Sequence, residues 1–434
     1  MPSLTAQNNQ NLMAEIYLKS VRMLVTYPAA WFVYNVYFHP LAGYPGPLLY
    51  RGSNFGKIVQ QMRGNITNKM NELHQIYGPV VRIAPWELSY ISAQAWKDIY
   101  TGQKGEPIIT KHVNLFMQRM RDNAGEAVDL VAWFNFTAFD IIGDLTFGEP
   151  FGCLENSQMH PWIRFIFANL KGMMYGQIIS TMGIFGAALK MLVPKRLREQ
   201  VLQHAAYSRD KVDRRLERRT SRPDFMAYII KHVGKEGGLS ANELLANAQI
   251  LIMAGSETSA TLLAGASYFL MRNPDKRRKL EQEVRSAFTR ESEISFASVC
   301  KLPYTLAVLH EAMRMHPPVP AGIHRFTPDG GAEIDGKWVA GGADVVVHQW
   351  AAYRNERYAG DNRDAFQPFG VGPRSCIGRG LAYMESRLVL ARLVWNFDME
   401  LMPESWNWTA QKTWVLYEKL PLKARLAPRC SASM

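Results

Sequence analysis

The stretch that decides the fold is Phe369–Gly380, which reads FGVGPRSCIGRG. One cysteine, Cys376, lies in it among four glycines, and an apolar run with helical spacing follows over 376–397. A cysteine that ligates a metal must be a thiolate, and nearby positive charge, such as that of Arg374, lowers the thiol pKa. Glycines allow a flat cofactor to approach the backbone, and amide groups at a helix N-terminus can hydrogen-bond to the sulfur. The pattern therefore indicates a metal-ligating cysteine rather than an ordinary glycine-rich turn around a buried one.

The composition is that of a globular protein with a large core, since 47% of the 434 residues are hydrophobic and 20% are charged. The 32 glycines and 23 prolines are too few for a collagen-like or a Pro/Gly-dominated disordered chain. The net charge of +12 is spread over short basic runs, which indicates a solvated surface and no nucleic-acid partner. The four cysteines include no Cys-x-x-Cys pair, which argues against a disulfide scaffold or structural zinc and favours a reducing compartment.

Helical periodicity dominates the middle of the chain, and short β-rich runs follow it. Apolar residues at three-to-four spacing predict helices over 126–147, 193–217, 241–272, 273–289 and 303–315. Residues 80–92 predict a strand, a turn at Pro85 and a second strand, and 337–339 and 345–347 are β-rich. The sequence has no internal repeats and no interdomain linkers. The expected fold is therefore one large domain, mainly α with a minor β region.

A second motif is the pair Glu311 and Arg314, which are three residues apart and therefore share a helix face. The apolar run 306–309 before it predicts that the pair is buried, and Pro317-Pro318 ends the helix directly after it. The alternative is a common surface pair, worth roughly a few tenths of a kcal/mol.

A third motif is the polar patch 254–259 (AGSETS) within an otherwise apolar helix. Such polar groups are costly in the middle of a buried helix, so the patch indicates a function. The alternative is a kink at which the Thr258 hydroxyl hydrogen-bonds to the carbonyl of Ala254, four residues earlier.

These motifs, and their order along the chain, resemble those of the cytochrome P450 family, the haem-thiolate monooxygenases. The family's cysteine loop reads Phe-x-x-Gly-x-Arg-x-Cys-x-Gly, and Phe369, Gly372, Arg374, Cys376 and Gly378 match every fixed position. The resemblance implies that Cys376 is the axial ligand of the iron of haem b. It also implies that Phe369 shields the sulfur, that Arg374 meets a haem propionate, and that the fold is a P450-like haem domain.

The polar patch 254–259 is similar to the family's oxygen-activating segment, and this resemblance implies roles for three of its residues. Thr258 would donate a hydrogen bond there, and Glu257 would relay protons from solvent. Gly255 would let the helix pass close to the oxygen-binding side of the haem. Thr258 and Glu257 are therefore the expected catalytic residues.

The remaining family positions are structural or bind the cofactor. Glu311 and Arg314 look like the family's Glu-x-x-Arg pair, which supports the haem side of the core. Arg357 is the candidate third member of that group. Arg325 is similar in placement to a strand arginine that contacts a haem propionate.

Residues 1–39 are expected to form an N-terminal segment, and the haem domain is expected over 40–434. Within the segment, 23–38 carries no charge, but an α-helix of that length reaches only about 24 Å, short of the ~30 Å hydrocarbon core of a membrane. Its aromatic residues suit a membrane interface. About 21–38 is therefore predicted as a marginal membrane anchor, and the alternative is an amphipathic helix packed on the body.

Stretches such as YFHPLAGYPGP look closest to fungal P450 members that modify secondary metabolites. That likeness implies an endoplasmic reticulum membrane protein whose catalytic domain faces the cytosol. The enzyme would insert one oxygen atom from O2 into a small apolar molecule of polyketide, terpenoid or alkaloid type. Its electrons would come from NADPH through a partner reductase.

Two segments that the family normally carries are missing or shortened. No Trp-x-x-x-Arg or His-x-x-x-Arg pair for a haem propionate lies between Trp96 and Val128, and the meander between Tyr353 and Asp364 is short. We hypothesise exon loss in the gene model or a gene in decay, which sequencing of the transcript would decide. The alternative function is a truncated, catalytically impaired or dead haem-thiolate homologue.

Overall fold

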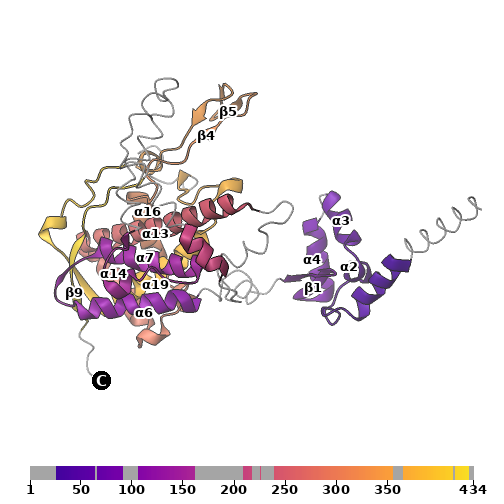
Figure 1. The fold of residues 1–434 in the computed structure, drawn as a ribbon, viewed down its shortest axis with the longest axis horizontal. Coiled ribbons are helices and arrows are strands. Elements are labelled where there is room, and N and C mark those ends of the chain that lie inside the picture. The colour runs from indigo at the N-terminus through magenta and orange to yellow at the C-terminus, as the bar shows by residue number, and fades with distance from the viewer. Residues whose placement is uncertain are drawn as a thin grey trace, which may run out of the picture. The chain divides into compact units, whose positions relative to one another are not determined.

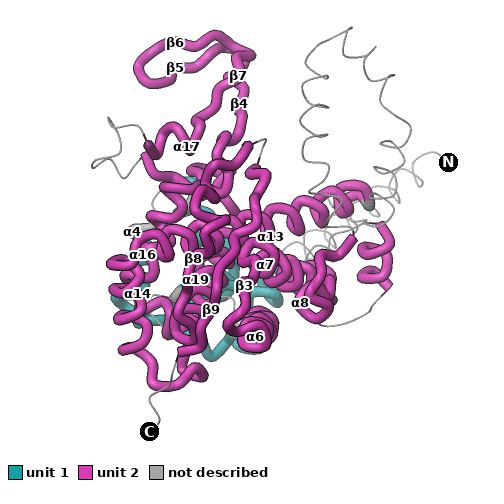
Figure 2. The backbone as a smooth tube through the Cα atoms, turned by 90° about the vertical axis from the view of Figure 1, so that its left-hand side faces the viewer, with its two compact units in different colours: residues 1–103 teal, residues 104–434 magenta. Residues whose placement is uncertain are grey.

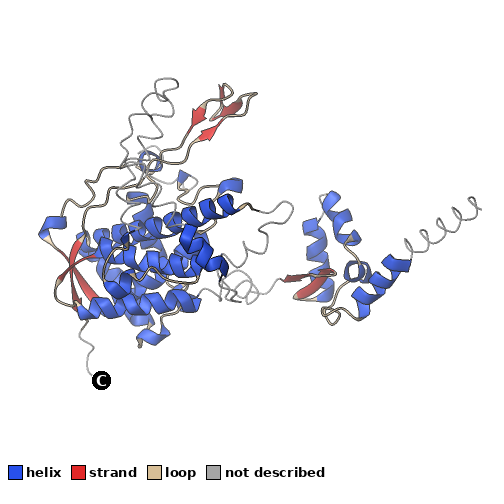
Figure 3. Ribbon diagram, in the orientation of Figure 1, coloured by secondary structure: helices blue, strands red, loops and turns tan. Residues whose placement is uncertain are grey.

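The computed structural model describes residues 26–63, 66–90, 106–161, 209–217, 225, 239–354, 365–413 and 416–429 (Figure 1). The chain divides into two compact units, residues 1–103 and 104–434 (Figure 2). Helices form most of the described structure, and the strands are few and short (Figure 3). The expected fold class, mainly α with a minor β region, is confirmed.

The first unit contains short helices and one β-hairpin. Its elements are a helix over 26–37, α2 (Leu48–Gly52), α3 (Phe55–Met62), α4 (Ile66–Tyr77), β1 (Val80–Ala84) and β2 (Glu87–Tyr90). The two strands are antiparallel, with Val80 opposite Tyr90, and Pro85 lies in the turn between them. The predicted hairpin is therefore confirmed. A small core is made of Tyr50, Leu73, Val81 and Ile83.

Two arginines fasten the end of the first described helix to this unit. The Arg82 side chain is fully buried, and its guanidinium donates a hydrogen bond to the carbonyl of Asn35 at 2.8 Å. Arg51 donates to the carbonyl of Val36 at 3.0 Å. These bonds satisfy carbonyl groups that a helix end leaves without a partner within the helix. They also supply acceptors to a buried guanidinium, whose burial without them would be costly.

The other face of this helix exposes aromatic side chains. Trp31, Tyr34 and Tyr37 are exposed, and the Trp31 ring lies 6.4 Å from that of Tyr27 and 5.8 Å from that of Tyr34. The end of the helix thus packs on the body of the unit, while the exposed aromatic face suits a membrane interface. Anchoring in a membrane stays a prediction.

The second unit is built around α13 (Ala241–Arg272), which packs against α7 (Leu130–Phe147), α16 (Pro303–Met315) and α19 (Arg379–Asn396). The other labelled helices described in this unit are α6 (Glu106–Asp122), α8 (Cys153–Asn156), α14 (Pro274–Ala287), α15 (Phe296–Val299) and α17 (Gln349–Ala352). Single 3-10 turns lie at Glu291–Glu293, Gly372–Arg374 and Pro403–Ser405.

The strands described in the second unit form three small antiparallel sheets. The largest has the order β3 (Ala127–Asp129), β9 (Lys423–Pro428) and β8 (Phe397–Leu401). The two-stranded sheets pair β4 (Arg325–Phe326) with β7 (Asp344–Val345), and β5 (Ala332–Ile334) with β6 (Lys337–Val339).

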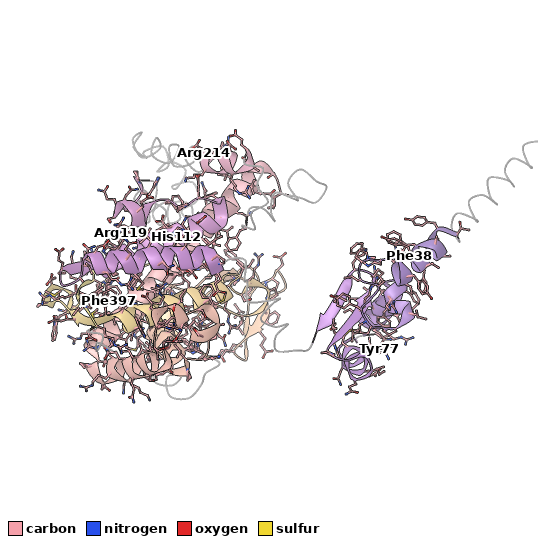
Figure 4. All side chains as sticks on the ribbon, turned by 90° about the horizontal axis from the view of Figure 1, so that it is seen from below. Phe38, Tyr77, His112, Arg119, Arg214 and Phe397 are labelled. Atoms are coloured by element: carbon pink, nitrogen blue, oxygen red, sulfur yellow. The ribbon has the colours of Figure 1, made fainter. Side chains whose placement is uncertain are left out.

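The helix α7 is apolar on all sides because it lies inside the core. Among the described residues it is the one helix long and apolar enough to cross a membrane, yet 94% of its apolar window is buried within the protein. The His112 imidazole of α6, labelled in Figure 4, lies with Nε2 2.9 Å from Oδ2 of Asp144 in α7. This buried pair fixes α6 against the core helix.

Four predicted helices are confirmed with limits close to those expected, as α13, α14, α16 and α19. The β-rich run 337–339 is strand β6, whereas of the run 345–347 only Val345 lies in a strand, β7. The predicted helix 126–147 begins only at Leu130, because 127–129 pairs with β9 as a strand. Of the segment 193–217 the structure describes 209–217, which is helical. The separate helix α6 and the C-terminal strands were not predicted.

A side chain from α14 caps the N-terminus of α16. Glu283 accepts hydrogen bonds from the backbone N–H groups of Tyr304 at 2.7 Å and Thr305 at 2.8 Å. A Glu283→Ala substitution leaves these donors without that acceptor, and we expect it to lower the free energy of unfolding by about 1–2 kcal/mol. Differential scanning fluorimetry would show this as a lower Tm. The control is Gln282→Ala, an exposed position on the same helix; an equal loss in both variants would contradict the capping role.

Candidate functional site

The cysteine loop is closed by a backbone hydrogen bond. The Cys376 N–H donates to the carbonyl of Phe369 at 2.8 Å. Gly370 and Gly372 have φ angles of 69° and 72°, in the left-handed region that side chains disfavour, so these two positions require glycine. The Cys376 thiol is free and exposed. The loop therefore presents a thiol outward from a defined backbone turn.

The thiol lies at the positive end of a helix. The helix α19 begins at Arg379, three residues after Cys376, with Gly378 at its N-cap. The backbone N–H groups of a helix N-terminus lack partners within the helix and attract a nearby anion or an acceptor such as sulfur. Arg374 is exposed within the same loop, and Ile377 is 96% exposed. A free thiol with a cation and an apolar side chain beside it fits the haem that the sequence predicts.

Phe369 connects the loop to the helical core. Its half-buried ring lies 4.9 Å from the ring of Tyr383 in α19. The Tyr383 hydroxyl in turn lies 3.0 Å from Nε2 of His310 in α16. The loop, α19 and α16 are therefore held together on the side of Phe369. The predicted shielding of sulfur by Phe369 stays a prediction.

The polar patch lies in the middle of one continuous helix, α13. The Thr258 hydroxyl donates to the carbonyl of Ala254 at 2.7 Å, which is the local bond that the alternative interpretation expected. Ala254 is exposed and Thr258 is half-exposed, whereas Ser256 and Glu257 are buried. The patch thus has an open side with Ala254 and Thr258 and a packed side with Glu257.

Gly255 has a packing reason that sequence reasoning did not give. A Cβ atom at this position would lie 2.7 Å from Cδ1 of Ile142 in α7, which is closer than real Cβ contacts come. Glycine therefore permits the close approach of α13 and α7. The described contacts do not test its predicted role beside the haem.

Glu257 points away from solvent, contrary to what a direct proton relay requires. Its side chain is 3% exposed, and Oε1 lies 2.9 Å from Nζ of Lys419. Burial raises the pKa of the Glu257 carboxyl, and the Lys419 ammonium opposes that shift. Lys419 comes from the C-terminal segment, and no pattern in the sequence linked it to this site. Any proton exchange between Glu257 and solvent must pass through other groups.

A second buried carboxyl joins α13 to the helix that follows the cysteine. The Ser259 hydroxyl of α13 donates to Oε2 of Glu385 in α19 at 3.3 Å. Glu385 is 1% exposed, and its Oε1 has no hydrogen-bond partner among the described residues. Burial raises the pKa of Glu385 to about 8. Sequence reasoning missed this residue, although an acid within the apolar run of 376–397 was an available signal.

The predicted pair on α16 forms a bidentate salt bridge. Arg314 donates to both carboxylate oxygens of Glu311, at 2.6 and 2.8 Å, and to the carbonyl of Tyr353 at 3.1 Å. The predicted burial is wrong in the described structure, since the Glu311 side chain is 60% exposed. The reason is helical phase, because Ala312 and Met313 face the core and the pair lies on the opposite side.

Of the two other predicted arginines, the structure describes one. Arg325 is exposed on β4, and its described hydrogen bond goes to the carbonyl of its neighbour His324 at 2.8 Å. Arg357 lies outside the described residues. Trp350 and Arg354 have the spacing of a propionate-binding pair, but the Arg354 guanidinium stacks over the Trp350 ring at 4.1 Å.

Comparisons with known proteins agree on one family. A model of the cytochrome P450 family matches residues 91–426. Cytochrome P450 monooxygenase astA of Talaromyces wortmannii is 38% identical over 95% of this chain and 97% of that protein. Averantin hydroxylase of Dothistroma septosporum is 38% identical over 91% of this chain and 88% of that protein. Trichothecene C-4 hydroxylase of Trichoderma arundinaceum is 38% identical over 92% of this chain and 94% of that protein.

The length of these alignments bears on the missing segments. The alignment with astA spans 481 positions, which is more than the 434 residues of this chain. Some positions of that relative therefore have no counterpart here, which is consistent with the two shortened segments. Both expected gaps involve stretches outside the described residues, 91–105 and 355–364.

Proposed function

This chain belongs to the cytochrome P450 family, and from that premise we propose that it hydroxylates an apolar secondary metabolite in a fungus. Membership makes it a haem-thiolate monooxygenase, which uses O2, a redox partner and a small-molecule substrate. Two of the similar proteins are hydroxylases by name, which supports hydroxylation over other oxygen insertions. The proposed substrate class is a polyketide, terpenoid or alkaloid.

The observation that carries this proposal is the free, exposed thiol of Cys376 in its closed loop at the start of α19. Cys376 would hold the iron of haem b, which supplies the oxygen-activating chemistry when bound. Arg374 would pair with a propionate, and Phe369 would keep water from the sulfur.

Thr258 and Glu257 would deliver the protons that the proposed reaction consumes. The Thr258 hydroxyl now donates to the Ala254 carbonyl at 2.7 Å, and a χ1 rotation would redirect that proton toward the open side of the helix. The Glu257 side chain lies on the packed side of the same helical turn. A positioned donor of this kind contributes about 10²–10⁴-fold to a proton-transfer step.

The proposed partners are an NADPH-dependent reductase and a membrane surface. We place the protein at the endoplasmic reticulum membrane with its catalytic domain in the cytosol. The exposed aromatic face of Trp31, Tyr34 and Tyr37 supports contact with a membrane interface.

A second candidate is a truncated, catalytically impaired or dead homologue. It is favoured by the alignment with astA, which is longer than this chain. The absence from the sequence of a propionate-binding pair between Trp96 and Val128 supports it further.

The ferrous–CO difference spectrum of the full chain, expressed with ample haem, tests the proposed function. We expect a Soret band typical of thiolate-ligated haem, because Cys376 and its loop are intact. Turnover with a fungal reductase would follow. No haem uptake, or a band typical of another ligand, would favour the impaired homologue.

A further inference from the structure

Glu257 meets a lysine from the far end of the chain. Nζ of Lys419 lies 2.9 Å from Oε1 of Glu257, with 4% of the lysine and 3% of the glutamate side chain exposed. Lys419 also donates to Oδ1 of Asn135 in α7 at 3.2 Å. One ammonium group therefore joins the polar patch of α13 to α7 and to the C-terminal segment.

The neighbours of Lys419 fix the backbone from which it extends. The Tyr417 ring stacks on that of His316, with centroids 3.9 Å apart and planes 16° apart. The Trp408 indole N–H donates to the carbonyl of Leu420 at 2.8 Å. Because the segment is held on both sides of Lys419, less conformational entropy remains to be lost when the ion pair forms.

Lys419 is the charged group that acts on Glu257 among the described residues. Burial raises the pKa of Glu257, and Lys419 alone counteracts it, through its charge and its hydrogen bond. The other titratable groups on the packed elements face elsewhere: Asp144 toward His112, Asp140 toward the amides of Cys153 and Leu154, and Glu385 toward Ser259. His316 is neutral, because burial and the charges of Lys419 and Arg354 lower its pKa to about 3.

The second oxygen of Glu257 is free to take part in proton exchange. Oε2 is buried and has no hydrogen-bond partner among the described residues. A buried carboxylate oxygen of this kind needs a proton or a water molecule. Thr258 is the next residue along the same helix. The ion pair therefore leaves one oxygen of Glu257 available, one residue before the threonine proposed to donate protons.

We propose that Lys419 is a positioning residue for the reaction. Its ammonium group is the counter-ion that holds the Glu257 carboxylate in place, one residue before Thr258. The C-terminal segment would thereby share in the control of proton delivery. This inference rests on the proposed function, in which Thr258 and Glu257 move protons. It adds a residue 162 positions away from Glu257 to that site.

The test compares four variants of the full chain. Lys419→Met removes the charge, Lys419→Arg keeps it, and the double variant Glu257→Gln/Lys419→Met removes both members of the pair. Lys412→Met is the matched control, because Lys412 is an exposed lysine of the same segment. If Lys419→Met does not fold, Lys419→Gln takes its place.

Two measurements are made on each variant. Isotope-edited infrared spectroscopy follows the Glu257 carboxyl, whose band is identified by its loss in the double variant. We expect the midpoint of Glu257 protonation to rise by about 1–3 pH units in Lys419→Met and to stay unchanged in Lys412→Met. Product formation should fall about 10- to 100-fold in Lys419→Met, with reducing equivalents diverted to hydrogen peroxide, while the ferrous–CO spectrum stays that of wild type.

Each contrary outcome has a distinct meaning. An unshifted midpoint in Lys419→Met would overturn the ion pair as the control on Glu257. A shifted midpoint with wild-type product formation, or recovered product formation in the double variant, would overturn the role in the reaction. A wild-type chain without a thiolate-type ferrous–CO spectrum would overturn the proposed function, and the reaction role of Lys419 with it.

Discussion

A Cys376→Ser variant is expected to lose the thiolate-type Soret band of the ferrous–CO form completely, and product formation should fall to background. A serine hydroxyl stays protonated at neutral pH and cannot replace the anionic sulfur that ligates the iron. The loop itself should persist, because serine keeps the backbone bond from residue 376 to the Phe369 carbonyl. The loss would therefore report ligation rather than unfolding, and an unchanged Tm of the haem-free protein would establish this.

Cys300→Ser is the matched control for that experiment. Cys300 is also exposed and free, and it accepts one long hydrogen bond from Arg387 at 3.5 Å. Its ferrous–CO spectrum should equal that of wild type. A thiolate-type band that survives in Cys376→Ser would show that a different residue ligates the iron.

The stability of a Glu385→Gln variant is expected to differ from that of wild type in a pH-dependent way. Burial raises the pKa of Glu385 to about 8 in the folded protein, from an ordinary value of 4.5. Between these values the folded state keeps a proton that the unfolded state has released. The free energy of unfolding of wild type therefore falls as pH rises through this window, and the contribution is complete only below about pH 4.5.

Glutamine has no titratable proton, so the free energy of unfolding of the variant should not fall in this way as pH rises. We expect Glu385→Gln to match wild type near pH 5 and to exceed its free energy of unfolding by about 2–4 kcal/mol at pH 8. The amide can still accept the hydrogen bond from Ser259, which spans 3.3 Å in wild type. Urea unfolding at pH 5, 6.5 and 8 would measure the difference.

Glu404→Gln provides the control, because Glu404 is exposed and lies in the 3-10 turn Pro403–Ser405, outside α19. It should follow wild type at every pH. If Glu385→Gln also runs parallel to wild type across the three pH values, Glu385 does not hold a proton in the folded protein.

Local features of the site were predictable because the residues that form them are close together in the sequence. The glycine spacing around Cys376 predicted a closed turn before a helix, and both are present. The three-residue spacing of Glu311 and Arg314 predicted their pairing. Long amphipathic runs gave the limits of α13, α14 and α16, since the helical period repeats many times in each.

Partners that meet only in the folded chain could not be predicted from such patterns. Lys419 is distant from Glu257 in sequence, and β3 pairs with a strand near the C-terminus. Burial of Glu311 was inferred from flanking apolar residues, but the phase of α16 turns it outward. Exposure depends on which side of a helix the neighbours cover, and a single apolar run does not specify that side.

The buried Arg82 has a practical consequence for preparing soluble forms of this protein. Deleting residues 1–39, the segment expected to precede the haem domain, would remove the carbonyls of Asn35 and Val36 that Arg82 and Arg51 bind. The Arg82 side chain would then stay buried with fewer acceptors, at a cost of about 1–3 kcal/mol. A deletion that ends before Thr26 keeps both carbonyls. For crystallisation, the helix over 26–37 should therefore be kept in the expressed protein.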